Sequence, residues 1–74
     1  MTLEILGRSG NLGLVRDGER RFPGLLVQGD TLSTLLDDLE EELPDGMATS
    51  TVRDWLSFYE DAMRAVGMKL PYIR

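Results

Sequence analysis

The chain has 74 residues, a formal net charge of −5 and neither cysteine nor histidine. This length has room for one domain, 1–74, which buries only about 60% of the surface exposed by the unfolded chain. Without cysteine the chain has no disulfides or thiolate metal sites. The N-terminus lacks a signal-peptide pattern, and no stretch has the roughly 18 apolar residues of a membrane span, so we expect a cytoplasmic protein.

Residues 1–29 predict a small antiparallel sheet with one leucine-rich face. Alternating or apolar runs bounded by turn residues are typical of strands. The expected strands are Thr2–Leu6, Leu12–Arg16 and Leu25–Gln28, the last buried on one or both faces. Arg8-Ser9-Gly10-Asn11 is turn chemistry, and Asp17-Gly18 is the favoured pair for a two-residue hairpin.

Residues 30–43 predict an amphipathic helix. Its apolar stripe consists of Leu32, Leu35, Leu36, Leu39 and Leu43, which recur with a helical period. Asp30 or Thr31 is expected to cap the first turn, and Pro44 ends the helix because it cannot continue the hydrogen-bond ladder. We expect this stripe to form the centre of the core.

Residues 51–66 predict a second helix, followed by an extended tail over 67–74. Thr51 and Asp54 resemble a capping box, and Gly67 is placed to end the helix in a left-handed turn. The apolar stripe is Val52, Trp55, Leu56, Tyr59, Ala62, Met63 and Val66. The fold class is therefore α+β, with a three-stranded antiparallel sheet followed by two helices packed on one sheet face.

The charge is concentrated in the first helix and the turn after it. Residues 30–46 hold seven acidic and no basic side chains, whereas the segments on either side are each slightly basic. Such a surface repels nucleic acid and attracts a basic protein surface. We therefore expect a partner protein with a basic surface.

Catalytic chemistry has little support in these residues. A serine nucleophile lacks its usual base, because the chain has no histidine and its only lysine, Lys69, lies in the tail. Asp37, Asp38 and Glu41 lie opposite the leucine stripe, but no second group of carboxylates is available to complete a magnesium site. We expect neither an enzyme nor a bound cofactor or metal.

The candidate binding residues are Asp37, Asp38, Glu41, Trp55, Phe58 and Tyr59. Aromatic side chains often dominate interface energy, and Phe58 lies at the edge of the apolar stripe rather than at its centre. The alternative interpretation is that Trp55, Phe58 and Tyr59 simply cover the sheet and that the carboxylates form only a solvated face.

The string Pro23-Gly24, three residues, then Gln28-Gly29-Asp30-Thr31 and an acidic helix resembles the N-terminal signature of HicB-type antitoxins. The longer string from Arg21 to Leu32 is also similar to small bacterial proteins regarded as toxin-immunity proteins. HicB-type antitoxins usually carry a C-terminal DNA-binding module, whereas only a helix and a tail follow here. The resemblance therefore implies toxin neutralisation more than DNA binding. Our hypothesis is that the protein binds a cognate bacterial toxin enzyme and inhibits it by covering its active site or its substrate surface.

Two alternatives stay open. One is a HicB-like regulator that binds nucleic acid, which would need a single basic surface made by Arg8, Arg16, Arg20, Arg21 and Arg53. The other is a small adaptor that only dimerises, through a free strand edge or the surface around Phe58.

Overall fold

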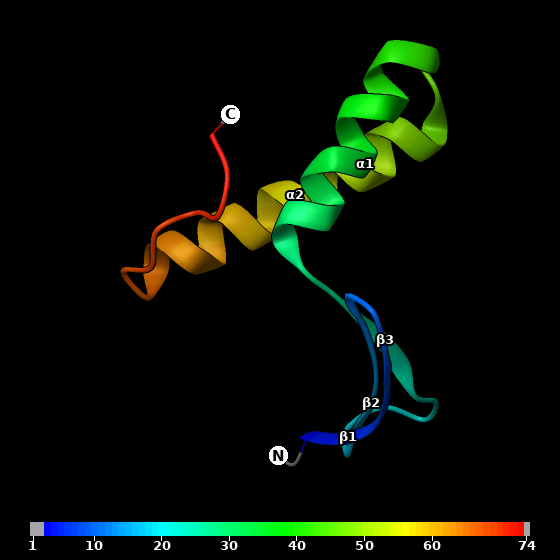
Figure 1. The fold of residues 1–74 in the computed structure, drawn as a ribbon, viewed down its shortest axis with the longest axis vertical. Coiled ribbons are helices and arrows are strands. Elements are labelled where there is room, and N and C mark those ends of the chain that lie inside the picture. Colours follow the sequence, from blue (N-terminus) through cyan, green and yellow to red (C-terminus); the bar gives the residue numbers. More distant parts are fainter. Residues whose placement is uncertain (1–2, 74) are drawn as a thin grey trace.

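A computed structural model describes residues 3–73 of the chain. The elements in chain order are β1 (Leu3–Ser9), β2 (Leu12–Asp17), β3 (Gly24–Val27), α1 (Gly29–Glu42) and α2 (Met47–Ala65). The strands form one antiparallel sheet in the order β1-β2-β3, and the two helices follow (Figure 1). The predicted α+β class, three antiparallel strands and then two helices, is confirmed.

The tight hairpin lies between β1 and β2. Gly10-Asn11 forms its two-residue loop, and Gly10 has φ 58°, a left-handed value that glycine adopts without steric cost. The prediction of a two-residue hairpin at Asp17-Gly18 was wrong, because β3 begins only at Gly24 and residues 18–23 form a longer loop.

α1 begins with Gln28 as its N-cap, whose carbonyl accepts a hydrogen bond from the Leu32 N–H at 3.0 Å. The predicted N-cap position at Asp30 or Thr31 was wrong, since both residues lie inside the helix and the side chain of Gln28 makes no capping hydrogen bond. Asp30 Oδ1 accepts a hydrogen bond from the N–H of Thr31 at 2.9 Å instead. Its negative charge still lies in the first turn, where it opposes the positive end of the helix dipole.

α2 is longer at its N-terminus than predicted. It begins at Met47 with Gly46 as N-cap, so the capping box expected at Thr51 and Asp54 was wrong and Thr51 lies inside the helix. Pro44 prevents α1 from continuing, and the short segment that contains it lets the chain reverse into α2.

The C-terminal end of α2 follows the expectation. Gly67 has φ 76°, and its N–H donates to the carbonyl of Arg64 at 3.0 Å. The N–H of Met68 donates to the carbonyl of Met63, also at 3.0 Å. These two bonds make a Schellman motif, which satisfies carbonyls left free at the end of the helix.

The core lies between the two helices. Leu36, Val52 and Leu56 are buried, with 1% of Leu36 and 2% of Leu56 exposed. The partly buried residues packed against them are Leu32, Leu39, Tyr59 and Tyr72. The predicted stripe was wrong for Leu35 and Leu43, which are exposed, because α2 covers only the part of α1 centred on Leu36.

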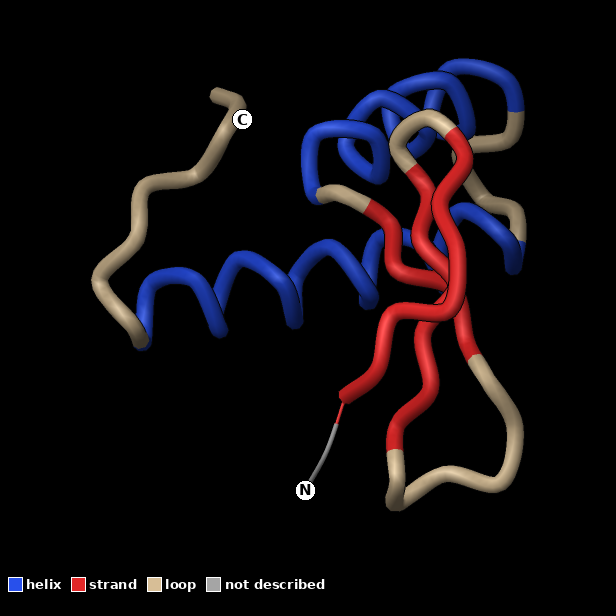
Figure 2. Tube along the Cα trace, turned by 60° about the horizontal axis from the view of Figure 1, so that its bottom comes forward, coloured by secondary structure: helices blue, strands red, loops and turns tan. Residues whose placement is uncertain are grey.

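The sheet is not covered by the helices, contrary to the expected packing on one sheet face. Within residues 3–73 the helices pack along each other, and no strand packs along a helix. Figures 1 and 2 show the sheet projecting from the N-terminal end of α1 while α2 runs away from it. The radius of gyration is accordingly 13.8 Å, against about 11 Å for a compact chain of this length.

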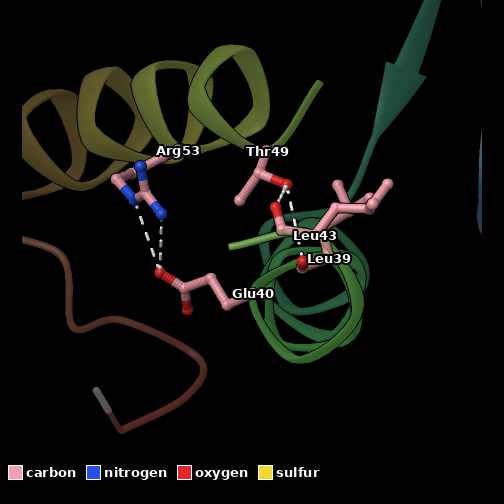
Figure 3. Close-up of polar contacts among 5 residues, drawn as sticks. All are labelled: Leu39, Glu40, Leu43, Thr49 and Arg53. Carbon is pink, nitrogen blue, oxygen red and sulfur yellow. Dashed lines mark hydrogen bonds and ion pairs between the residues drawn. The ribbon is translucent and has the colours of Figure 1, made fainter. Parts of the chain in front are cut away.

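Thr49 joins the start of α2 to the end of α1 and is fully buried. Its hydroxyl donates to the carbonyl of Leu43 at 2.6 Å and lies 3.4 Å from that of Leu39 (Figure 3). This side chain therefore satisfies a carbonyl that α1 leaves without a helical partner.

We expect Thr49→Val to lower the free energy of unfolding by about 1 kcal/mol, because the shape is kept and a buried hydrogen bond is lost. Thr51→Val is the matched control, since Thr51 lies on the same helix and is exposed. Urea unfolding followed by circular dichroism measures both. Equal effects in the two variants would contradict a special role for the Thr49 hydroxyl.

Candidate functional site

The acidic surface lies on the outer side of α1. Asp37, Asp38 and Glu41 are all exposed, and their spacing places them on the side of the helix turned away from buried Leu36. No basic residue occurs in α1. The predicted carboxylates are therefore brought together on one helix surface, which we call the acidic face.

An ion pair between Arg53 and Glu40 joins the two helices along one side. The guanidinium of Arg53 on α2 donates to Glu40 Oε2 on α1, at 3.2 Å from Nη2 and 3.4 Å from Nε (Figure 3). Both side chains remain partly exposed, so the pair contributes at most about 1 kcal/mol. It neutralises one carboxylate at the border of the acidic face and fixes the helices against each other.

The aromatic candidates do not share a surface with the acidic face. Trp55 and Arg53 are two positions apart on α2, so their side chains lie about 160° apart around the helix axis. Trp55 is therefore on the side of α2 opposite the ion pair that Arg53 makes with α1. Trp55 is 58% exposed and Phe58 is 75% exposed. The exposure foreseen for Phe58 is present, and Trp55, expected within the buried stripe, is exposed as well. The predicted binding residues therefore divide between two surfaces.

Tyr59 belongs to the interior rather than to either surface. It is only partly exposed and packs against the core. Its ring stacks on Tyr72 with centroids 6.5 Å apart and also lies against Gly29 at the start of α1. The hydroxyl of Tyr72 donates to Glu60 Oε2 at 3.0 Å, so the tail folds back onto α2 instead of remaining apart.

The basic side chains are dispersed. Arg16 pairs with Glu4 on the sheet at 3.4 Å, and Arg53 pairs with Glu40 between the helices. The guanidinium of Arg21 lies over the ring of Phe22 at 5.4 Å from its centroid. Two of the five arginines that nucleic-acid binding would need, Arg16 and Arg53, therefore lie beside carboxylates.

Two further findings concern chemistry within residues 3–73. No group of three His, Cys, Asp or Glu side chains is placed to hold a metal ion. Neither described helix has the combination of length and apolar character needed to cross a bilayer.

The leucine-rich face predicted for the sheet is present but exposed, and sequence reasoning missed its exposure. Leu12 pairs with Val27 and Leu14 with Leu25 across β2 and β3, so these four side chains lie on one face, and all are exposed. We call them the leucine patch. The sequence feature that could have indicated this surface is the run Leu25, Leu26 and Val27, since three apolar residues in a row place apolar groups on both faces of a strand. The expected burial of this run was wrong.

These features define a small α+β domain with an acidic helix and two exposed apolar surfaces. The chain belongs to DUF6959, a family of unknown function, whose model matches residues 1–51. The match includes the sheet, α1 and the first residues of α2. The chain matches no curated protein, and it matches no solved structure.

Proposed function

We propose that the protein is a toxin-neutralising immunity protein or antitoxin of the bacterial cytoplasm. It binds a basic surface on a cognate toxin enzyme through the acidic face of α1 and blocks the active site of that enzyme. The observation that supports this proposal is the exposure of Asp37, Asp38 and Glu41 together on a helix without basic residues.

The geometry suits an electrostatic inhibitor. Enzymes that act on anionic substrates have positively charged clefts, and a helix that carries only negative charge on its outer side is complementary to such a cleft. Leu36 of α1 and Leu56 of α2 pack in the core between the two helices. The carboxylates on the other side of α1 are therefore carried by a helix that is packed against α2. The resemblance of residues 21–32 to antitoxin and immunity-protein sequences also supports toxin neutralisation.

Long-range attraction between the two charged surfaces accelerates their encounter and weakens as salt screens it. The affinity for the toxin is therefore expected to fall as ionic strength rises.

The test is co-expression with the product of the neighbouring gene, measured as rescue of bacterial growth. We expect the triple charge reversal Asp37→Lys, Asp38→Lys and Glu41→Lys to abolish protection while the helical circular dichroism spectrum is unchanged. All three side chains are exposed, and surface changes of this kind rarely alter stability by more than about 0.5 kcal/mol each.

The matched control reverses three exposed carboxylates outside the acidic face, with Glu19→Lys, Asp54→Lys and Asp61→Lys. It changes the net charge by the same amount and is expected to leave protection intact. Protection that survives the first triple variant, or that both triple variants lose equally, removes the acidic face of α1 from the mechanism.

A further inference from the structure

The chain exposes more surface than a compact protein of its size. Its accessible area is 5992 Å² for a mass of 8.3 kDa. A compact monomer of that mass exposes about 4,600 Å², so the surplus is about 1,400 Å². A stable interface of standard size buries about 800 Å² on each partner. The surplus is therefore large enough for a stable interface.

Part of the surplus is a second apolar surface, on α2. Trp55, Phe58, Ala62 and Val66 follow one another at intervals of three and four residues, so they lie along one side of the helix. All four are exposed, Phe58 most of all among the aromatic residues of α2. We call them the α2 stripe. The first residue of α1, Gly29, lies against Tyr59, and the stripe continues along the chain beyond that position, through Ala62 to Val66.

The leucine patch has a shape that can receive a projecting side chain. Gly7 pairs with Leu14 in the sheet, and nothing fills the space where a side chain of Gly7 would stand. This space belongs to a hollow with three leucines in its lining, which consists of Gly7, Arg8, Ser9, Leu12, Gly13, Leu14 and Leu25. A helix carrying aromatic side chains is the usual cover for such an apolar sheet face.

The α2 stripe and the leucine patch do not meet within one chain, since no helix packs along a strand in residues 3–73. In two copies related by a twofold axis, the stripe of each covers the patch of the other, so the contact forms twice. Pairing through strand edges is less favoured, because β1 is interrupted by a bulge between Ile5 and Gly7 and β3 has only four residues.

The geometry points to a homodimer in which the α2 stripe of each copy packs on the leucine patch of its partner. This inference goes beyond the proposed function, because the acidic face of α1 takes no part in it. A surplus of about 1,400 Å² buried on each copy gives an interface in the range of obligate dimers. The acidic faces of both copies stay available for other proteins.

The first test is the mass in solution by sedimentation equilibrium over a range of protein concentrations. We expect the unmodified protein at twice 8.3 kDa, and Phe58→Glu and Leu25→Glu each at the mass of one chain, because each buries a charge in an apolar contact. Phe58 is 75% exposed and Leu25 is 67% exposed in the single chain, so both variants are expected to keep their circular dichroism spectrum.

The matched controls carry the same charge on the same elements, facing elsewhere. The first control is Ser57→Glu, at a residue of α2 outside the α2 stripe. The second is Leu26→Glu, at a residue of β3 whose side chain lies on the sheet face opposite the leucine patch. Both are expected to retain the mass of two chains. An unmodified protein that is monomeric at all concentrations, or a dimer that survives both Phe58→Glu and Leu25→Glu, overturns the proposal.

Mixing the two monomeric variants tests which surface meets which. A mixed pair consists of one Phe58→Glu chain and one Leu25→Glu chain. In the proposed dimer, the changed stripe of the first chain meets the changed patch of the second, and at the other contact the unchanged stripe of the second chain meets the unchanged patch of the first. We therefore expect the mixture, unlike either variant alone, to recover a measurable fraction at the mass of two chains. If like surfaces paired instead, every contact in the mixture would contain one glutamate, and a mixture without any dimer contradicts the proposed pairing.

Discussion

Leu36→Ala is expected to lower the free energy of unfolding by about 2–5 kcal/mol, the usual cost of removing a buried leucine and leaving a cavity. Leu36 is 1% exposed and lies at the centre of a core that, within residues 3–73, contains only two other buried apolar residues, Val52 and Leu56. A chain of this length has about 4–11 kcal/mol of total stability. The variant is therefore expected to be close to unfolded at 37 °C.

The control for this prediction is Leu35→Ala, which removes the same atoms from the next position of α1. Leu35 is 45% exposed, so we expect a loss of about 1 kcal/mol or less. Urea unfolding at one fixed protein concentration measures both variants, because association would add to the apparent stability. Similar losses at the two positions would mean that α1 does not bury its Leu36 side against α2.

Local signals in the sequence were sufficient for the order and kind of the elements. Pro44 and Gly67 end the helices by backbone chemistry that needs no distant partner. Turn residues were less decisive. Gly10-Asn11 and Asp17-Gly18 both suit tight hairpins, and only the first forms a two-residue hairpin loop. At the second, the N–H of Arg20 closes a turn by donating to the carbonyl of Asp17 at 2.9 Å, but the chain does not pair directly afterwards. The choice between them depends on strand register, which is set across the whole sheet.

Helix starts were harder to predict than helix ends. Asp30 and Thr51 have side chains that commonly act as caps, yet Gln28 and Gly46 occupy those positions. At the second of these sites, the buried Thr49 hydroxyl bonds to the carbonyl of Leu43 in α1. Such a contact joins two helices, and a local capping pattern does not contain it.

Periodicity could not show which apolar side chains the fold buries. It placed Leu35, Leu36, Trp55 and Leu56 in apolar stripes alike, but only Leu36 and Leu56 are buried. Sequence reasoning therefore found the acidic face of α1, the exposure of Phe58 and a leucine-rich sheet face. It did not predict that the leucine patch is exposed, because that exposure results from where the sheet projects.

Gly29 contacts Tyr59 at the point where the chain passes from the sheet into α1. Gly29 is the first residue of α1, directly after the segment that leaves β3, and the ring of Tyr59 from α2 lies against it. The ring also stacks on Tyr72, so it cannot move away without losing a second contact. This contact joins both helices and the tail at the place where the sheet begins.

We expect Gly29→Ala to lower the free energy of unfolding by about 1–3 kcal/mol, because the added Cβ overlaps the ring of Tyr59. Helix propensity alone predicts the opposite sign, since alanine is better than glycine in a helix by up to about 1 kcal/mol. The decisive comparison is therefore the same change in a Tyr59→Ala background, where the overlap is absent and Gly29→Ala is expected to be neutral or stabilising. Chemical unfolding of the four proteins in this double-mutant cycle gives the coupling between the two residues. A destabilisation of equal size in both backgrounds would place the cost in the backbone at Gly29 and not in its contact with Tyr59.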